Sequence, residues 1–288
     1  MPTFEPRKKE RSTPYFVQNR QDERELTRLT IQDRMITTSM GGVLPEQADP
    51  TRLHRVLDIA CRTGGWAIEA AQQYPTMSVF GIDTNGRMIE YARAQATAHH
   101  VTDRIEFAVM DALLILEFPN GFFDLVNLSF SGSFMLTYDW PKMLSEMLRV
   151  TRPGGIVRVM EPEILHQCNS PALTQLLEMF QRAMYRAGHL FEEKTTSIIA
   201  RLPGMLTQHG CMDVQVKVSP LEFHTGTAEG EAYYNDMASA FRTVHPFLKK
   251  WGGISGDYEV IYQQALHEMR AATFHSTWNM LTTWGNKP

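Results

Sequence analysis

The sequence predicts an α/β fold, with a mostly parallel sheet of seven strands covered by helices on both faces. Short apolar runs alternate with amphipathic helical segments between residues 55 and 160. Repeated units of this length imply right-handed crossovers between parallel strands. The chain has 288 residues, 43% of them hydrophobic, which fits one large domain with an elaboration or a small cap.

The first half of the chain holds most of the expected strands. Residues 21–40 carry apolar residues near helical spacing and Gly41-Gly42 supply a C-cap, so we expect a helix there that covers the sheet. Strands are expected at residues 55–59, 78–82, 105–109, 123–128 and 156–160. Helices are expected at residues 66–74, 88–96 and 142–149, with a turn at residues 152–155.

Beyond residue 161 the pattern becomes mainly helical. Helices are expected at residues 173–184 and 198–208, and two more around residues 230–241 and 258–270. Strands are expected at residues 214–218 and 276–283. The connection between these two strands, about 50 residues, is too long to be bare in a compact domain. We therefore expect it to form a helical lid over a substrate pocket.

The most informative stretch is Val56–Trp66, in which an apolar run ends in a carboxylate at Asp58 and an amphipathic segment begins at Gly65. A strand, a tight loop and a helix in this order build ligand sites in open α/β sheets. Asp58 would repel the pyrophosphate of a dinucleotide, and the Gly-x-Gly-x-x-Gly fingerprint is absent. The loop therefore favours a positively charged nucleoside cofactor.

Two further acids, Asp83 and Asp111, follow at the ends of the next two strands. Each spacing is about one βα unit, so we expect all three carboxylates at the same edge of the sheet. Asp83 can accept hydrogen bonds from both ribose hydroxyls, while Asp111 and the backbone N–H of Ala112 can bind adenine. Asp58 would lie under the positive end of the ligand. The alternative interpretation is that these acids are ordinary strand-end and helix caps.

The Val56–Trp66 stretch resembles motif I of the class I S-adenosylmethionine (SAM) methyltransferases, roughly Asp-x-Gly-x-Gly-x-Gly. Aligned on Asp58, the glycine positions fall at Ala60, Arg62 and Gly64. With the other acids and the Arg-Pro-Gly-Gly turn, the resemblance covers residues 50–160 or so and implies a Rossmann-like fold with SAM as cofactor. The cofactor-binding residues that it implies are Tyr15, Asp58, Ala60, Gly64, Asp83, Thr84, Met88, Asp111, Ala112 and Asn127.

The resemblance also predicts a role for the N-terminal segment and a division of the chain into parts. Thr13–Phe16 is similar to a segment that folds over SAM in some small-molecule methyltransferases, which would let Tyr15 close the site. Alternatively, Tyr15 packs a terminal arm onto the core. The expected parts are an arm and helix over the cofactor site (residues 1–45), a methyltransferase core (46–222 and 273–288) and the helical lid (223–272).

Arg62 departs from the motif at a position where glycine permits φ > 0 and a close approach of the ligand. An arginine in the left-handed region costs on the order of 1–3 kcal/mol. Its side chain could pair with the cofactor carboxylate, turn outward, or block the pocket. In the last case the chain would be a non-catalytic relative with impaired SAM binding.

The resemblance implies a SAM-dependent methyltransferase. The Asn-Pro-Pro-Tyr and Asp-Pro-Pro-Tyr motifs of amino-directed nucleic-acid and protein methyltransferases are absent, because Asn127–Phe130 reads Asn-Leu-Ser-Phe. We therefore expect methyl transfer to O, C or N of a bulky small molecule, in specialised metabolism, with His189 and His245 as candidate general bases. The alternative is a SAM-binding protein that catalyses a transfer-free reaction such as a cyclisation.

Composition limits the other kinds of ligand, partner and location that we expect for this protein. A net charge of −4 gives no reason to expect nucleic-acid binding. Cys61, Cys168 and Cys211 are far apart and lack the spacing of a zinc site, so no metal is expected. No run reaches the roughly 20 apolar residues of a membrane span, and we expect a cytoplasmic protein without a membrane partner. A homodimer formed through the N-terminal helix is left open.

Overall fold

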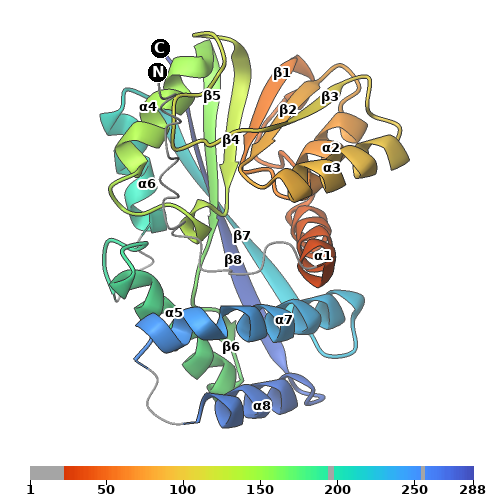
Figure 1. Ribbon diagram of the computed structural model, residues 1–288, viewed down its shortest axis with the longest axis vertical. Helices are drawn as coiled ribbons and strands as arrows, with labels where there is room; N and C mark the ends of the chain where they lie inside the picture. The colour runs from red at the N-terminus through yellow and green to blue at the C-terminus, as the bar shows by residue number, and fades with distance from the viewer. Residues whose placement is uncertain (1–22, 194–197, 254–256) are drawn as a thin grey trace, which may run out of the picture.

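The computed structural model describes residues 23–193, 198–253 and 257–288, so the predicted cofactor residue Tyr15 lies outside them (Figure 1). The strands are β1 (Arg55–Ile59), β2 (Ser78–Asp83), β3 (Ile105–Val109), β4 (Phe123–Ser129), β5 (Thr151–Pro162), β6 (Gln167–Cys168), β7 (Met212–His224) and β8 (His275–Asn286). The α-helices are α1 (Glu23–Met40), α2 (Gly65–Gln73), α3 (Gly86–Ala98), α4 (Trp140–Val150), α5 (Pro171–Arg186), α6 (Ile198–Gln208), α7 (Ala228–Trp251) and α8 (Tyr258–Met269).

The described strands form one sheet in the order β3-β2-β1-β4-β5-β8, with β7 and the short β6 both paired to β8. Strands β1 to β5 run parallel to one another, and β8 is antiparallel to β5, β6 and β7. The prediction of a mostly parallel sheet is therefore confirmed. The strand order reverses between β1 and β4, and open α/β sheets bind ligands beyond the carboxyl ends of the strands at such a point.

Strand β6 is an addition to the seven strands predicted. Strand β5 pairs only with Met280–Asn286 of β8, so the first residues of β8 have no partner from β5 on that side. Gln167 and Cys168 pair there with Thr277 and Ser276. A two-residue strand has no detectable period in the sequence, so the prediction missed it.

Several predicted boundaries are wrong. Strand β7 continues to His224, past its expected end at residue 218, and two other differences have clear physical reasons. The expected turn at residues 152–155 lies inside β5, where Gly154 has a φ of 72° and the register against β4 shifts without ending the strand. Helix α7 continues through Pro246 well past its expected end at residue 241. Phe247 and Leu248 are buried beyond the proline, and their packing keeps the last turn helical.

Helices cover both faces of the sheet. Neighbouring strand residues point to opposite faces, and Val56 and Leu57 are both fully buried in this way. Val56 packs in a cluster with residues of α2 and α3, whereas Leu57 packs in a larger cluster with residues of α4, α5 and α6. Burial on both faces explains why these strands read as continuous apolar runs.

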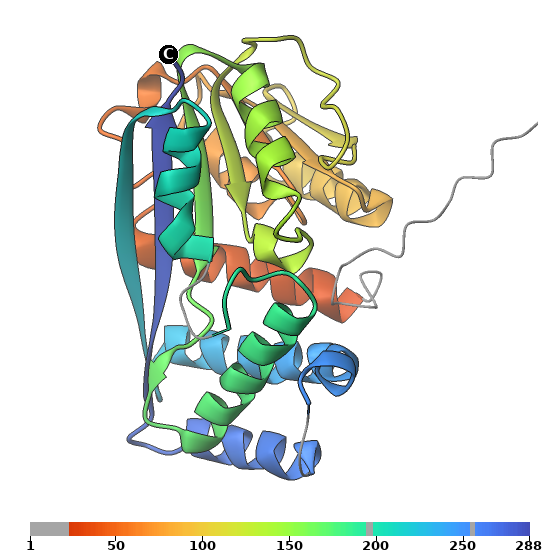
Figure 2. The same ribbon diagram turned by 90° about the vertical axis from the view of Figure 1, so that its left-hand side faces the viewer.

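A layer of helices, α5, α7 and α8, lies beyond the carboxyl edge of the parallel strands (Figures 1 and 2). Helices α7 and α8 come from the predicted lid, whereas α5 precedes it in the chain. Helix α1 joins this layer, because Arg28 and Gln32 of α1 both donate to the Asp236 carboxylate of α7, at 2.6 and 2.9 Å. No described helix is long and apolar enough to cross a membrane.

Candidate functional site

The loop after β1 has the backbone shape of a glycine-rich loop, although two of its three glycine positions hold other residues. Ala60, Arg62 and Gly64 have φ values of 57°, 54° and 77°. Position 64 has no room for a side chain, since an added Cβ would lie 2.7 Å from the Phe107 ring. Left-handed backbone at Ala60 and Arg62 costs of order 1–3 kcal/mol each, so contacts around the loop must hold it.

The Arg62 side chain supplies such contacts by turning toward α1. Its Nη1 donates to Gln32 Oε1 at 3.0 Å, and its Nη2 forms an ion pair with Asp33. The guanidinium carbon also lies 4.5 Å from the centroid of the Phe130 ring. Burial raises the pKa of Asp33, and the charge of Arg62 opposes that rise. Arg62 therefore ties the loop to α1.

The three acids at the strand ends lie along the carboxyl edge of the sheet, each offset by two residues from the acid on the neighbouring strand. Asp58 pairs with Gly81, two residues before Asp83, and Asp83 pairs with Val109, two residues before Asp111. Offsets of two keep side chains on the same face of a sheet. Asp58 and Asp83 are each 3% exposed, whereas Asp111 is half-buried.

The first two acids converge on the loop. Asp83 accepts hydrogen bonds from the backbone N–H groups of Arg62, at 3.2 Å, and Asn85, at 2.9 Å. Burial raises the pKa of the Cys61 thiol, and the nearby charges of Asp58 and Asp83 raise it further. The side of the loop that faces the sheet is therefore acidic, as a cationic ligand requires.

The other residues predicted to bind a cofactor lie around β2 and β3. The Asp111 carboxylate accepts a hydrogen bond from Leu113 N–H at 2.9 Å. Ala112 and Met88 are buried, and Thr84 is exposed. Met88 also lines the cavity described below.

Asp58 begins a buried polar row that crosses the sheet. Asn127 Nδ2 donates to Asp58 Oδ1 at 2.8 Å, and Arg158 Nη1 donates to Asn127 Oδ1 at 2.6 Å. Arg158 Nε then donates to Glu46 Oε1 at 2.7 Å, in an ion pair that is almost fully buried. Burial raises the pKa of Asp58 to about 7. Burial acts in the same direction on Glu46, but Arg158 holds the pKa of Glu46 below its usual value.

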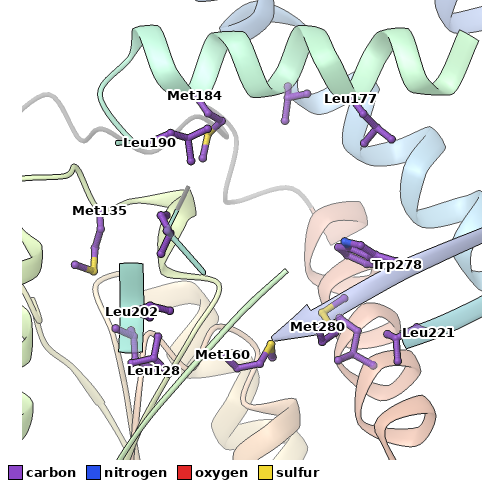
Figure 3. Close-up of a cluster of buried hydrophobic side chains, with 14 of the residues drawn as sticks. Leu128, Met135, Met160, Leu177, Met184, Leu190, Leu202, Leu221, Trp278 and Met280 are labelled. Atoms are coloured by element: carbon purple, nitrogen blue, oxygen red, sulfur yellow. The ribbon is translucent and has the colours of Figure 1, made fainter. Parts of the chain in front are cut away.

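A cavity of about 370 Å³ lies between the carboxyl edge of the sheet, α1 and the helical layer. Its walls are mostly apolar, and Figure 3 shows Leu177 and Met184 of α5 on one side with Trp278 of β8 on the other. Met237 and Phe241 of α7 also line it. Phe241 thus brings an aromatic ring of the predicted lid to the cavity wall, and its carbonyl oxygen accepts from the Tyr258 hydroxyl of α8. The cavity extends to the loop after β1, since its lining includes Arg62, Met88 and Phe130.

Glu161, at the end of β5, brings a buried carboxyl group to the wall of this cavity. Its Oε1 accepts hydrogen bonds from the Ser131 backbone N–H, at 2.6 Å, and hydroxyl, at 2.5 Å. Its Oε2 accepts from Gly132 N–H at 3.3 Å. Burial raises the pKa of Glu161 to about 7, which is suitable for a general base. Sequence reasoning missed this residue, although it follows an apolar run just as Asp58 does.

The two histidines predicted to be catalytic are not among the residues that line the cavity. His189 is buried, with Nδ1 at 2.9 Å from the Met135 carbonyl oxygen. The His245 ring in α7 stacks on Tyr258 of α8, with centroids 4.1 Å apart. Among the described residues, no cluster of His, Cys, Asp and Glu suits a metal ion.

Comparison with known proteins places this site in context. Residues 56–155 match the family model described as a methyltransferase domain. Demethylmenaquinone methyltransferase of Deinococcus radiodurans is 37% identical over 107 residues, which are 37% of this chain and 42% of that protein. The chain therefore spans less than half the length of that relative.

A second relative matches over more of its length. Ubiquinone/menaquinone biosynthesis C-methyltransferase UbiE of Geobacter sp. is 31% identical over 173 residues, which are 56% of this chain and 72% of that protein. Among solved structures, a putative methyltransferase from Bacillus halodurans has a TM-score of 0.54 at 17% identity, over 87% of this chain and 99% of that one. This structural likeness supports the fold.

Proposed function

Since the chain belongs to the class I SAM-dependent methyltransferases, we propose that it transfers the methyl group of SAM to a carbon atom of a bulky, mostly apolar small molecule that bears an ionisable hydroxyl. The observation that carries the proposal is the Glu161 carboxyl group on the mostly apolar cavity wall. The names of the relatives support a carbon acceptor of the quinone type, because one is a demethylmenaquinone methyltransferase and the other a C-methyltransferase.

The residues around the loop after β1 fit SAM. SAM supplies a methyl group activated by a sulfonium, so the acidic side of the loop suits its charge. Asp83 would hold the ribose hydroxyls, and Asp111 with the Ala112 N–H would hold the adenine. The left-handed backbone at positions 60, 62 and 64 keeps the shape that this loop has with glycine. The Arg62 side chain is held by Gln32 and Asp33 of α1.

The cavity supplies what the acceptor needs. In its ionised form Glu161 accepts the hydroxyl proton of the acceptor, and the backbone N–H groups of Ser131 and Gly132 keep the carboxylate in position. Loss of that proton would increase the electron density on the ring carbon. This carbon would form the new C–CH3 bond as the S–CH3 bond of SAM breaks and S-adenosylhomocysteine leaves, and it would then lose its hydrogen as a proton to restore the aromatic ring. Apolar walls exclude water, and the enclosed shape aligns the reactants in line.

An acceptor panel with the full chain tests this proposal. The protein is incubated with methyl-labelled SAM and either reduced demethylmenaquinone with a short prenyl tail or its hydroxyl-free analogue. We expect S-adenosylhomocysteine and a C-methylated product, identified by mass spectrometry, from the hydroxylated acceptor alone. Asp83→Asn is the matched control, in which weaker SAM binding by calorimetry should accompany slower turnover. Absence of S-adenosylhomocysteine with every acceptor contradicts the proposal, and product formed without it indicates a transfer-free reaction.

A further inference from the structure

A second polar group on the cavity wall, His166, is held by elements far from the loop after β1. His166 lies between β5 and β6, lines the cavity and is 8% exposed. Its Nδ1 is 2.6 Å from the hydroxyl of Tyr233 in α7, which is 3.0 Å from the Ser276 hydroxyl in β8. The Trp278 ring packs on the imidazole with centroids 4.8 Å apart. These contacts fix the orientation of the imidazole ring.

The chain of hydroxyls determines which nitrogen of His166 carries the proton. Among the described residues, Tyr233 is the one hydrogen-bond partner of the Ser276 hydroxyl. If Tyr233 donated to Ser276, the Ser276 proton would have no acceptor. The arrangement that gives both buried hydroxyl protons an acceptor therefore runs from Ser276 to Tyr233 and from Tyr233 to Nδ1 of His166. Burial lowers the pKa of His166 to about 3, so the ring stays neutral and Nε2 carries its proton.

This arrangement leaves an N–H donor on the cavity wall. Within residues 23–193, 198–253 and 257–288, the Tyr233 hydroxyl is the one hydrogen-bond partner of His166, and it is taken by Nδ1. The Nε2–H is therefore available to a ligand in the cavity that the imidazole lines. Among the described residues, His166 Nε2 is not one of the buried side-chain atoms that lack a partner, so it keeps some accessible surface, and a ligand oxygen in the cavity can accept from it.

We propose that His166 determines acceptor specificity: its Nε2–H donates a hydrogen bond to a second oxygen atom of the methyl acceptor. This inference rests on the proposed function. It assigns the acceptor two oxygen atoms, a hydroxyl that faces Glu161 and a second oxygen, such as the other hydroxyl of a reduced quinone, that accepts from His166. The two groups differ in role, because Glu161 removes a proton whereas His166 donates a hydrogen bond and keeps its proton. Tyr233 and Ser276 are positioning residues that set the tautomer.

Two probes that differ by one carbonyl group test the proposal without any methyl transfer. The full chain is titrated with 1-tetralone and with tetralin, which have the same bicyclic carbon skeleton. We expect wild-type protein to bind 1-tetralone about 10-fold more tightly, as one net hydrogen bond allows. His166→Asn, which keeps a polar group near Nδ1 but none at Nε2, should reduce this ratio to about 1.

Two further variants serve as controls. His166→Gln, whose amide reaches the Nε2 position, should keep most of the preference for 1-tetralone. Tyr233→Phe removes the donor to Nδ1 and should lower the ratio several-fold, which provides a test if His166→Asn does not fold. An unchanged ratio in His166→Asn overturns the proposal, including the case in which both probes bind equally more weakly, because that result marks a structural role.

The result also separates this inference from the proposed function. A ratio that depends on His166 in a protein that methylates no acceptor supports the donor site and contradicts the methyl transfer. Methyl transfer with a ratio independent of His166 supports the proposed function and overturns the donor site.

Discussion

Asp58 and Glu161 occupy equivalent places in the fold and have similar electrostatics, yet their surroundings differ. Each lies at or near the carboxyl end of a parallel strand, and burial raises the pKa of each to about 7. Asp58 is bonded to Asn127 within the buried row that ends at Glu46. Glu161 instead lines the cavity and is held by backbone N–H groups. A raised pKa therefore does not identify a catalytic group, whereas access to the cavity distinguishes these two carboxyls.

The largest effect is expected from breaking the buried row near Asp58. Arg158→Met removes the partner of Glu46 and leaves a buried carboxylate without its counter-charge. Loss of one partner of a buried ion pair costs about 3–5 kcal/mol. We expect the free energy of unfolding, measured in urea, to fall by that amount. Adding Glu46→Leu to Arg158→Met removes the remaining charge and should restore much of the stability. If Arg158→Met alone is as stable as wild type, that result contradicts a structural role for the row.

Glu161→Gln tests whether Glu161, the carboxyl group on the cavity wall, acts as the general base. Removing a general base typically costs 10²- to 10⁴-fold in rate, so turnover should fall by about 10²-fold or more. In wild-type protein the rate should rise with pH through about 7, the pKa of Glu161, and then level off. The variant should lose this rise while its affinity for SAM, measured by calorimetry, stays within about 2-fold. A pH–rate profile that keeps its shape in the variant assigns the rise to another group, such as Asp58.

The same substitution should change how stability depends on pH. Burial raises the pKa of Glu161 from 4.5 to about 7, so between these values the folded state holds a proton that the unfolded state releases. Stability contributed by this group is therefore present at low pH and is lost as pH rises through this window, by on the order of 3 kcal/mol. Glu161→Gln should narrow the difference in unfolding free energy between pH 5 and pH 8. Equal differences in variant and wild type contradict the assigned pKa.

The two carboxyls also show what the sequence could predict. The bounds of β1 and β3 agree with the prediction. Asp58 was predicted because a loop and further acids follow it at regular spacing. Glu161 is part of no recognisable loop motif, and its partners Ser131 and Gly132 lie on another strand connection. His166 depends in the same way on Tyr233 and Ser276, which are distant in the chain. When residues come together only through tertiary packing, no regular spacing in the sequence indicates that they form a cluster.

The smallest effects are expected at Arg62, whose charge lowers the pKa of both carboxyls against the effect of burial. Ala60→Gly is the matched control, because Ala60 has almost the same left-handed φ and no charge. Ala60→Gly should change stability by less than about 1 kcal/mol, since strain is relieved while the unfolded chain gains freedom. Arg62→Gly relieves similar strain but also leaves Asp33 without its ion-pair partner, so it should be the less stable variant.

Activity separates the two glycine variants further. The rise of rate with pH should move to higher pH in Arg62→Gly alone, because the positive charge near Glu161 is lost. SAM affinity should stay unchanged in both variants, since the Arg62 side chain is held by Gln32 and Asp33. Tight SAM binding only after Arg62→Gly would show that the arginine blocks the cofactor site. An equal pH shift in Ala60→Gly would instead trace the effect to the loop backbone, because that variant changes no charge.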